Sequence, residues 1–138
     1  TIVGNNATVQ AGGVYTTQSG SRIRNCIIRG NTSPNSGSPT DNADLYTNQS
    51  TANQALMFRN VCTPLAIGTA CVTGDPLLKD AARGNYGIAP ASPCRNAGTN
   101  EAWMADARDY AGNPRLVSKV VDIGACESPS GGVIFLVR

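Results

Sequence analysis

Apolar and polar residues alternate over short stretches of this chain, and the same pattern returns further along the sequence. Three pairs of segments share it: residues 1–5 with 27–31, residues 14–19 with 45–50, and residues 23–26 with 58–61. The offsets are 26 (27 minus 1), 31 (45 minus 14) and 35 (58 minus 23), so they grow as expected if one repeat were lengthened by two loop insertions. Repeats of this length are typical of solenoid proteins.

The repeat that contains Ile23, Cys26 and Ile28 predicts the conformation of the chain. These side chains share one face only if the strand bends at Asn25, and Asn tolerates the left-handed conformation that the bend requires. Asn60 holds the equivalent position, so we expect Asn25 and Asn60 to stack and to hydrogen-bond through their amides as an asparagine ladder. β-Branched residues favour strands. The sequence therefore predicts an all-β fold, a right-handed parallel β-helix (a solenoid) with an irregular C-terminal capping segment.

The chain of 138 residues is long enough for one domain. We expect three parts: β-helix coils over residues 1–74, a C-terminal cap of the same domain over 75–127, and a linker with an apolar tail strand over 128–138. Residue 1 falls inside a repeat, which indicates that the chain is part of a longer or processed precursor.

Composition and charge argue against several classes of partner. The net charge is +2, charged residues make up 14%, aromatic residues 5%, and the basic residues form no cluster. We therefore expect no nucleic-acid partner. No apolar run is long enough to cross a bilayer, and no signal peptide is recognisable, so we expect no membrane span.

Five cysteines in a chain of this size indicate an oxidising compartment. Cys62 and Cys71 flank a short loop, which predicts a disulfide between them. The cysteines form no CxxC pair and the chain has no His, so the spacing does not fit a zinc site, and we expect no metal and no other cofactor.

The C-terminal half carries four motifs in a distinctive order: DPLLKD (75–80), GNYGIAPASPCRNAG (84–98), DYAGNPR (109–115) and VDIGACE (121–127). Together they resemble the closing segment of secreted bacterial right-handed β-helix proteins of the choice-of-anchor Q type, in the pectate-lyase-like superfamily. The resemblance covers most of residues 61–127, whereas residues 1–60 match only the general pattern of the superfamily. It implies a bacterial protein that is secreted or at the cell surface, and no agreed catalytic activity.

The same resemblance bears on two sets of side chains. The closing strand of the family commonly has an aromatic residue where this chain has Cys126, and with Cys94 present we expect a Cys94–Cys126 disulfide. The alternative is two separate buried thiols. The charged members of the motifs are expected to cap turns and to form one ion pair rather than to catalyse: Asp109, Arg115, Asp122 and Glu127.

An apolar stretch ends the chain after the linker. It is too short to cross a membrane and too apolar to stay free in water, so it either packs on its own sheet or adds a strand to another molecule. Because the first repeat would also leave an open edge, we predict head-to-tail self-association into a filament. The predicted self-association residues are Val133, Ile134, Phe135, Leu136 and Val137.

The side chains of the repeats bear on whether the chain catalyses a reaction or binds a ligand. Residues 1–60 contain only two acids, Asp41 and Asp44, and lack the aligned carboxylates of polysaccharide lyases or hydrolases, so we do not expect an enzyme. An outward strip of aromatic rings and amides is a predicted glycan-binding surface, the alternative being a cross-strand stack that only stabilises the sheet. The strip consists of Tyr15, Tyr46, Gln18 and Gln49.

The sequence thus predicts an extracellular structural or adhesive β-helix module. Its expected partners are further copies, neighbouring coils of a larger chain, or glycans. The alternative is a fragment of a carbohydrate-binding or polysaccharide-degrading β-helix enzyme whose catalytic coils lie outside this chain.

Overall fold

The computed structural model describes residues 1–34, 43–117 and 119–129. Its elements in chain order are β1 (Ile2–Val3), β2 (Val14–Thr16), β3 (Ile23–Arg29), β4 (Leu45–Thr47), α1 (Thr51–Met57), β5 (Phe58–Cys62), β6 (Leu78–Asp80), the 3-10 helix η1 (Ala81–Arg83), β7 (Asn85–Ile88) and the 3-10 helix η2 (Ala102–Met104).

The repeats pair in parallel with the predicted register. β1, β3 and β5 form one sheet in that order, and β2 pairs with β4 in a second sheet. Ile2 lies opposite Ile28, Val14 opposite Leu45, and Cys26 opposite Val61. The alignment of the three pairs of segments is therefore confirmed.

The predicted right-handed parallel β-helix is wrong. The described residues form three small separate sheets, the third being the antiparallel pair β6–β7, and none of them closes or continues as a solenoid. The strands have at most seven residues, in β3, and as few as two, in β1. A solenoid needs several stacked repeats to bury a continuous core, and here only two isolated parallel bridges follow β5.

Helix α1 also departs from the all-β prediction. It follows β4 and begins after Ser50, whose side chain accepts a hydrogen bond from the Asn53 backbone N–H. A Ser at this position satisfies one of the free N–H groups of the first turn, and Ala, Gln, Leu and Met in the helix have high helix propensity. The helix buries Met57 directly before β5.

The three-stranded sheet lies between two apolar cores. Ile28 and Val61 belong to a cluster that also contains Leu45, Met57, Phe58 and Ile67. Their chain neighbours Ile27 and Cys62 point to the opposite face and belong to a second cluster with Ile88, Cys94 and Ile123. The first core lies between the parallel sheets and α1, and the second lies between the three-stranded sheet and residues 89–129, which we call the closing segment.

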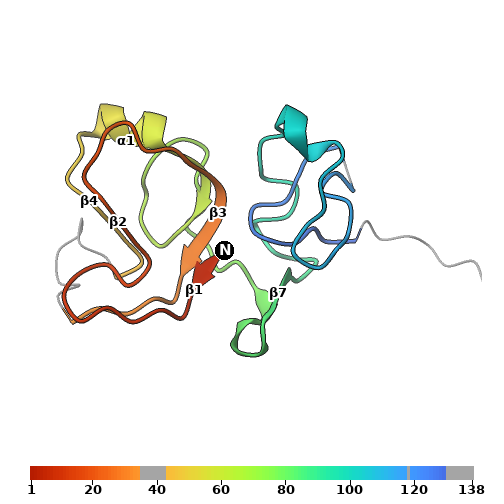
Figure 1. The fold of residues 1–138 in the computed structure, drawn as a ribbon, viewed down its shortest axis with the longest axis horizontal. Coiled ribbons are helices and arrows are strands. Elements are labelled where there is room, and N and C mark those ends of the chain that lie inside the picture. Colours follow the sequence, from red (N-terminus) through yellow and green to blue (C-terminus); the bar gives the residue numbers. More distant parts are fainter. Residues whose placement is uncertain (35–42, 118, 130–138) are drawn as a thin grey trace, which may run out of the picture.

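Figure 1 shows these two parts side by side. Residues of β1 to β5 and α1 form one group, the closing segment forms the other, and β7 lies at the edge between them. Backbone contacts join the groups: Gly124 N–H donates to the Asn25 carbonyl at 3.0 Å, and Ala125 N–H donates to the Thr1 hydroxyl at 3.0 Å.

Asn25 and Asn60 have the predicted left-handed backbone, with φ of 49° and 52°. Their side chains do not form the predicted ladder with each other. The Asn25 amide donates to the Thr99 carbonyl at 2.8 Å and accepts from the Thr99 N–H at 2.8 Å. Asn60 donates to the Ala97 carbonyl and accepts from the Thr99 hydroxyl. Both amides therefore bind the closing segment.

A ladder contact between equivalent asparagines occurs elsewhere. The Asn5 amide donates to the Asn31 side-chain oxygen at 2.9 Å, and Asn31 in turn donates to the Ile2 carbonyl. Both follow a glycine with φ of 70°, Gly4 and Gly30. The Gly-Asn pair recurs in the aligned segments, and this recurrence is the sequence signal for the contact between Asn5 and Asn31.

Replacing Asn25 tests how much its amide contributes to the folded state. Asn25→Ala removes two hydrogen bonds and puts in the left-handed region a residue that tolerates it less well than Asn, so we expect a loss of roughly 2–4 kcal/mol in the free energy of unfolding. Asn25→Gly loses the same hydrogen bonds without the backbone strain, and we expect it to be about 1 kcal/mol less damaging. Denaturant unfolding measures both; equal losses would show that the backbone conformation contributes nothing.

Candidate functional site

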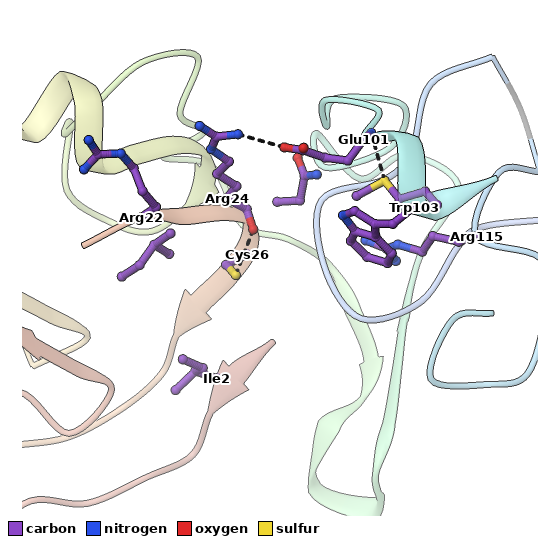
Figure 2. A pocket seen from close by; sticks show the side chains of 10 residues that line it. Ile2, Arg22, Arg24, Cys26, Glu101, Trp103 and Arg115 are labelled. Atoms are coloured by element: carbon purple, nitrogen blue, oxygen red, sulfur yellow. Dashed lines mark hydrogen bonds and ion pairs between the residues drawn. The ribbon is translucent and has the colours of Figure 1, made fainter. Parts of the chain in front are cut away.

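A cleft of about 540 Å³ lies between the N-terminal end of β3 and η2 in the closing segment. In Figure 2 the side chains of Arg22, Arg24 and Cys26 lie along one wall and Trp103 stands on the other. The lining residues are Ile2, Arg22, Ile23, Arg24, Asn25, Cys26, Glu101, Trp103, Met104 and Arg115.

One ion pair crosses this cleft. Arg24 Nη1 lies 2.9 Å from Glu101 Oε1, and the two side chains are 45% and 31% exposed. An ion pair this open to water contributes little to stability. Its effect is to orient the start of η2, because Glu101 is the residue that directly precedes that helix.

The cleft offers cationic and aromatic groups rather than a catalytic pair. Trp103 is 64% exposed. The Arg22 guanidinium bonds only to the Ser19 and Ser21 carbonyls among the contacts of the described chain. Glu101 is the one carboxylate among the lining residues, whereas glycoside hydrolysis uses two carboxyl groups. These groups can bind a ligand but do not form that catalytic arrangement.

The predicted glycan-binding tyrosines form a stack. The rings of Tyr15 and Tyr46 lie 4.9 Å apart between centroids and are nearly parallel, at 9°. This is the cross-strand stack given above as the alternative to a glycan-binding surface. Tyr15 remains 55% exposed, so part of its ring is still accessible to a ligand.

The two predicted glutamines differ in their environment. Gln49 donates to the Thr17 carbonyl at 2.5 Å and accepts from the Asn53 amide at 2.9 Å, so its side chain is engaged within the fold. Gln18 is exposed. The structure therefore brings Tyr15 and Tyr46 together and uses Gln49 to hold the segment after β4 against the segment after β2.

The charged residues of the closing segment form a buried network, as expected of structural groups. Arg115 and Glu127 form an ion pair at 3.0 Å with side chains 8% and 2% exposed. Asp122 accepts from the backbone N–H groups of Asn96 and Ser128. Asp109 accepts from those of Asn113 and Glu127. The prediction that these groups cap turns and form one ion pair is confirmed.

Burial raises the pKa of Glu127 to about 7. The N–H of Asp122 and the charge of Arg115 oppose this effect, but burial is the larger cause. Arg115 lies within ion-pair distance of Oε1, yet this oxygen makes no directed hydrogen bond among the described residues. The carboxylate is therefore only partly compensated for the water it has lost.

All five cysteines carry free thiols. The predicted Cys62–Cys71 disulfide is absent because the two side chains point to different cores: Cys62 belongs to the cluster under the closing segment, and Cys71 packs on the other cluster. The predicted Cys94–Cys126 disulfide is also absent; Cys94 belongs to the same buried cluster as Cys62. Burial raises the pKa of the thiols of Cys26, Cys71 and Cys126.

The three-stranded parallel sheet differs at its two sides. On one side β5 is covered, because Arg59 bridges to Thr69 and Cys62 bridges to Val72. On the other side β1 pairs only with β3 and β2 only with β4, within the residues that the structure describes. We call the outer side of β1 and β2 the open edge. The predicted partner of this edge, residues 133–137, lies outside the described residues.

Sequence reasoning missed the cleft. Its walls come from β3 and from η2, and no local pattern relates these segments. The available signal was the exposed Trp103, the chain's one tryptophan, in a stretch that no repeat explains.

The described part of the chain contains no group of three or more His, Cys, Asp and Glu side chains placed to hold a metal ion. None of its helices has the length and apolar character needed to cross a membrane.

The buried Glu127 predicts a pH dependence of stability. Since its folded pKa of about 7 is above its ordinary value of 4.5, the folded state holds a proton that the unfolded state has released between these pH values. The contribution is full below pH 4.5 and is lost as the pH rises through 7. We expect the free energy of unfolding to fall by about 2–3 kcal/mol from this group between pH 4 and pH 8.

Glu127→Gln should reduce this dependence, because a neutral amide does not titrate. Denaturant unfolding at several pH values measures it. The same decline with pH in Glu127→Gln as in the wild type would assign the effect to another group.

Comparison of the chain with protein-family models, with curated proteins and with solved structures gave no significant match. The likeness to the choice-of-anchor Q type therefore stays a prediction from the sequence motifs.

Proposed function

We propose that this chain is a non-catalytic structural or adhesive module of a secreted or cell-surface protein, which associates by accepting a strand at its open edge. The observation that carries this proposal is the strand order: β1 and β2 are both outermost in their sheets, while the opposite side of β5 is covered by residues 69–72. An outer strand presents unpaired N–H and C=O groups, which are a template for pairing with another chain.

The chemistry of the edge supports pairing with an apolar strand. Ile2 and Val14 pack against the core beside this edge, and Tyr15 on β2 is 55% exposed. No charged residue occurs between Thr1 and Gly20, and inward or flanking charges are a common protection of strand edges. The apolar residues 133–137 of a second copy have the composition that such an edge accepts.

A secreted or cell-surface location is supported by composition. The chain has five cysteines, little charge and many turn-forming residues, which are frequent in extracellular modules. A head-to-tail contact of this kind joins different surfaces of two copies, so repetition of the contact produces an open filament rather than a closed dimer.

Sedimentation velocity over a range of concentrations tests the association. The full chain should show species larger than a monomer that increase with concentration. Tyr15→Lys places a charge on the open edge and should leave a monomer, because a lysine on an edge opposes strand addition. Removal of residues 130–138 should have the same effect.

Leu56→Lys is the matched control, since Leu56 is 63% exposed on α1, outside the open edge. It should associate like the wild type. A full chain that stays monomeric at all concentrations would refute the proposal.

Carbohydrate binding is a second candidate function, favoured by the exposed ring of Tyr15 in the tyrosine stack. Sugars pack their apolar faces on aromatic rings of this kind. The stack is continuous over two strands and stands clear of the core.

A glycan array tests this second function. If it holds, the wild type should bind a defined set of glycans, and Tyr15→Ala combined with Tyr46→Ala should lower the signal at least about tenfold, the equivalent of one lost stacking contact. Leu56→Ala serves as the control and should bind normally. Unchanged binding by the double variant would place any sugar site elsewhere.

A further inference from the structure

Two thiols from distant parts of the sequence meet in the core beneath the closing segment. Cys62 is the last residue of β5, and Cys94 lies in the turn after β7. Both side chains are completely buried, in one cluster with Ile27, Ile88 and Ile123. The Cys62 thiol donates to the Gly74 carbonyl at 3.4 Å, and each of the two thiols shifts the pKa of the other.

The backbone on both sides of this contact is fixed. Cys94 N–H donates to the Ser92 hydroxyl at 3.1 Å, and its carbonyl accepts from the Ile123 N–H at 2.9 Å. On the other side, Thr63 N–H donates to the Val72 carbonyl at 3.0 Å, directly after Cys62. The two cysteines are therefore held beside each other by separate hydrogen-bond networks.

We propose that Cys62 and Cys94 form a disulfide that fastens the closing segment to β5. The bond would join two cysteines that already lie in one buried cluster, whereas pairing with Cys71 or Cys126 would require a side chain to leave its own surroundings. Neither the repeat pattern nor the motifs of the closing segment assign this pair.

The oxidation balances with a small disulfide such as glutathione disulfide as the oxidant. The Cys94 thiolate attacks one sulfur of that disulfide, so that one glutathione thiol leaves and a mixed disulfide forms. The Cys62 thiol then loses its proton, attacks the Cys94 sulfur and displaces the second glutathione. Two protein thiols are oxidised, and one glutathione disulfide is reduced to two thiols.

Because both sulfurs are fully buried in the folded chain, the exchange takes place while the closing segment is not yet packed on β5.

Peptide mapping of the full chain tests the proposal without any substitution. The protein is refolded in a glutathione redox buffer, alkylated and digested without reduction, and analysed by mass spectrometry. The expected product joins the peptides of Cys62 and Cys94, two hydrogen atoms lighter than their sum. Titration in denaturant should then find three free thiols, the five cysteines minus these two.

Stability and variants provide the second readout. Reduction of the oxidised protein should lower its melting temperature by roughly 10 °C, the effect expected for opening a loop of this length. Cys62→Ser and Cys94→Ser should both abolish the cross-linked peptide, and Cys71→Ser and Cys126→Ser should retain it. Five free thiols after oxidative refolding, or a peptide that links Cys62 to Cys71 or Cys94 to Cys126, would overturn the proposal.

Discussion

The left-handed backbone at Asn25 and Asn60 is the constraint on which the rest of the structure depends. A bend at these positions lets the residues before and after it point into the same core, so Ile23, Cys26 and Ile28 all face the first core. The bend also turns the two amides outward, where they bind the backbone of residues 97–99. One backbone conformation thus shapes the strand and supplies the hydrogen bonds that attach the closing segment.

This attachment explains why the closing segment can carry buried charges. Gly98 packs so closely on Val121 and Asn25 that a β-carbon there would lie 2.7 Å from a Val121 methyl and 3.0 Å from the Asn25 side-chain oxygen. Behind this contact, Asp109, Asp122 and Glu127 accept hydrogen bonds from backbone N–H groups that would otherwise be unsatisfied. No strand occurs among the described residues of this segment, so side-chain carboxylates take the role that a sheet ladder has elsewhere.

The register of the strands could be predicted from the sequence because equivalent residues recur at matching positions, as Tyr15 and Tyr46 do. The fold class could not, since the same local pairings are compatible with a long solenoid and with three small sheets. The number of repeats and the presence of helix α1 decide between these two folds. The all-β prediction did not take the helix propensity of residues 51–57 into account. The charged groups of the closing segment were assigned correctly because turn carboxylates bond nearby backbone, which is a local property.

Strand geometry explains why the structure does not bring Cys62 and Cys71 together. Adjacent side chains of a strand face opposite sides, so Val61 and Cys62 cannot share a core. Cys71 packs on the cluster of Val61, away from Cys62. The expected Cys62–Cys71 bridge relied on loop length alone and ignored this alternation. The cleft and the Cys62–Cys94 contact were beyond local patterns, because each joins the three-stranded sheet to residues far along the chain.

The outer sides of β5 and β1, at the two edges of the three-stranded sheet, differ from each other. Residues 69–72 cover β5 with parallel bridges, and the closing segment covers one face through Ile27 and Cys62. β1 has neither kind of cover on its outer side among the described residues. Any partner at this edge therefore meets a surface that differs from the covered side, and contacts between unlike surfaces extend an assembly rather than close it.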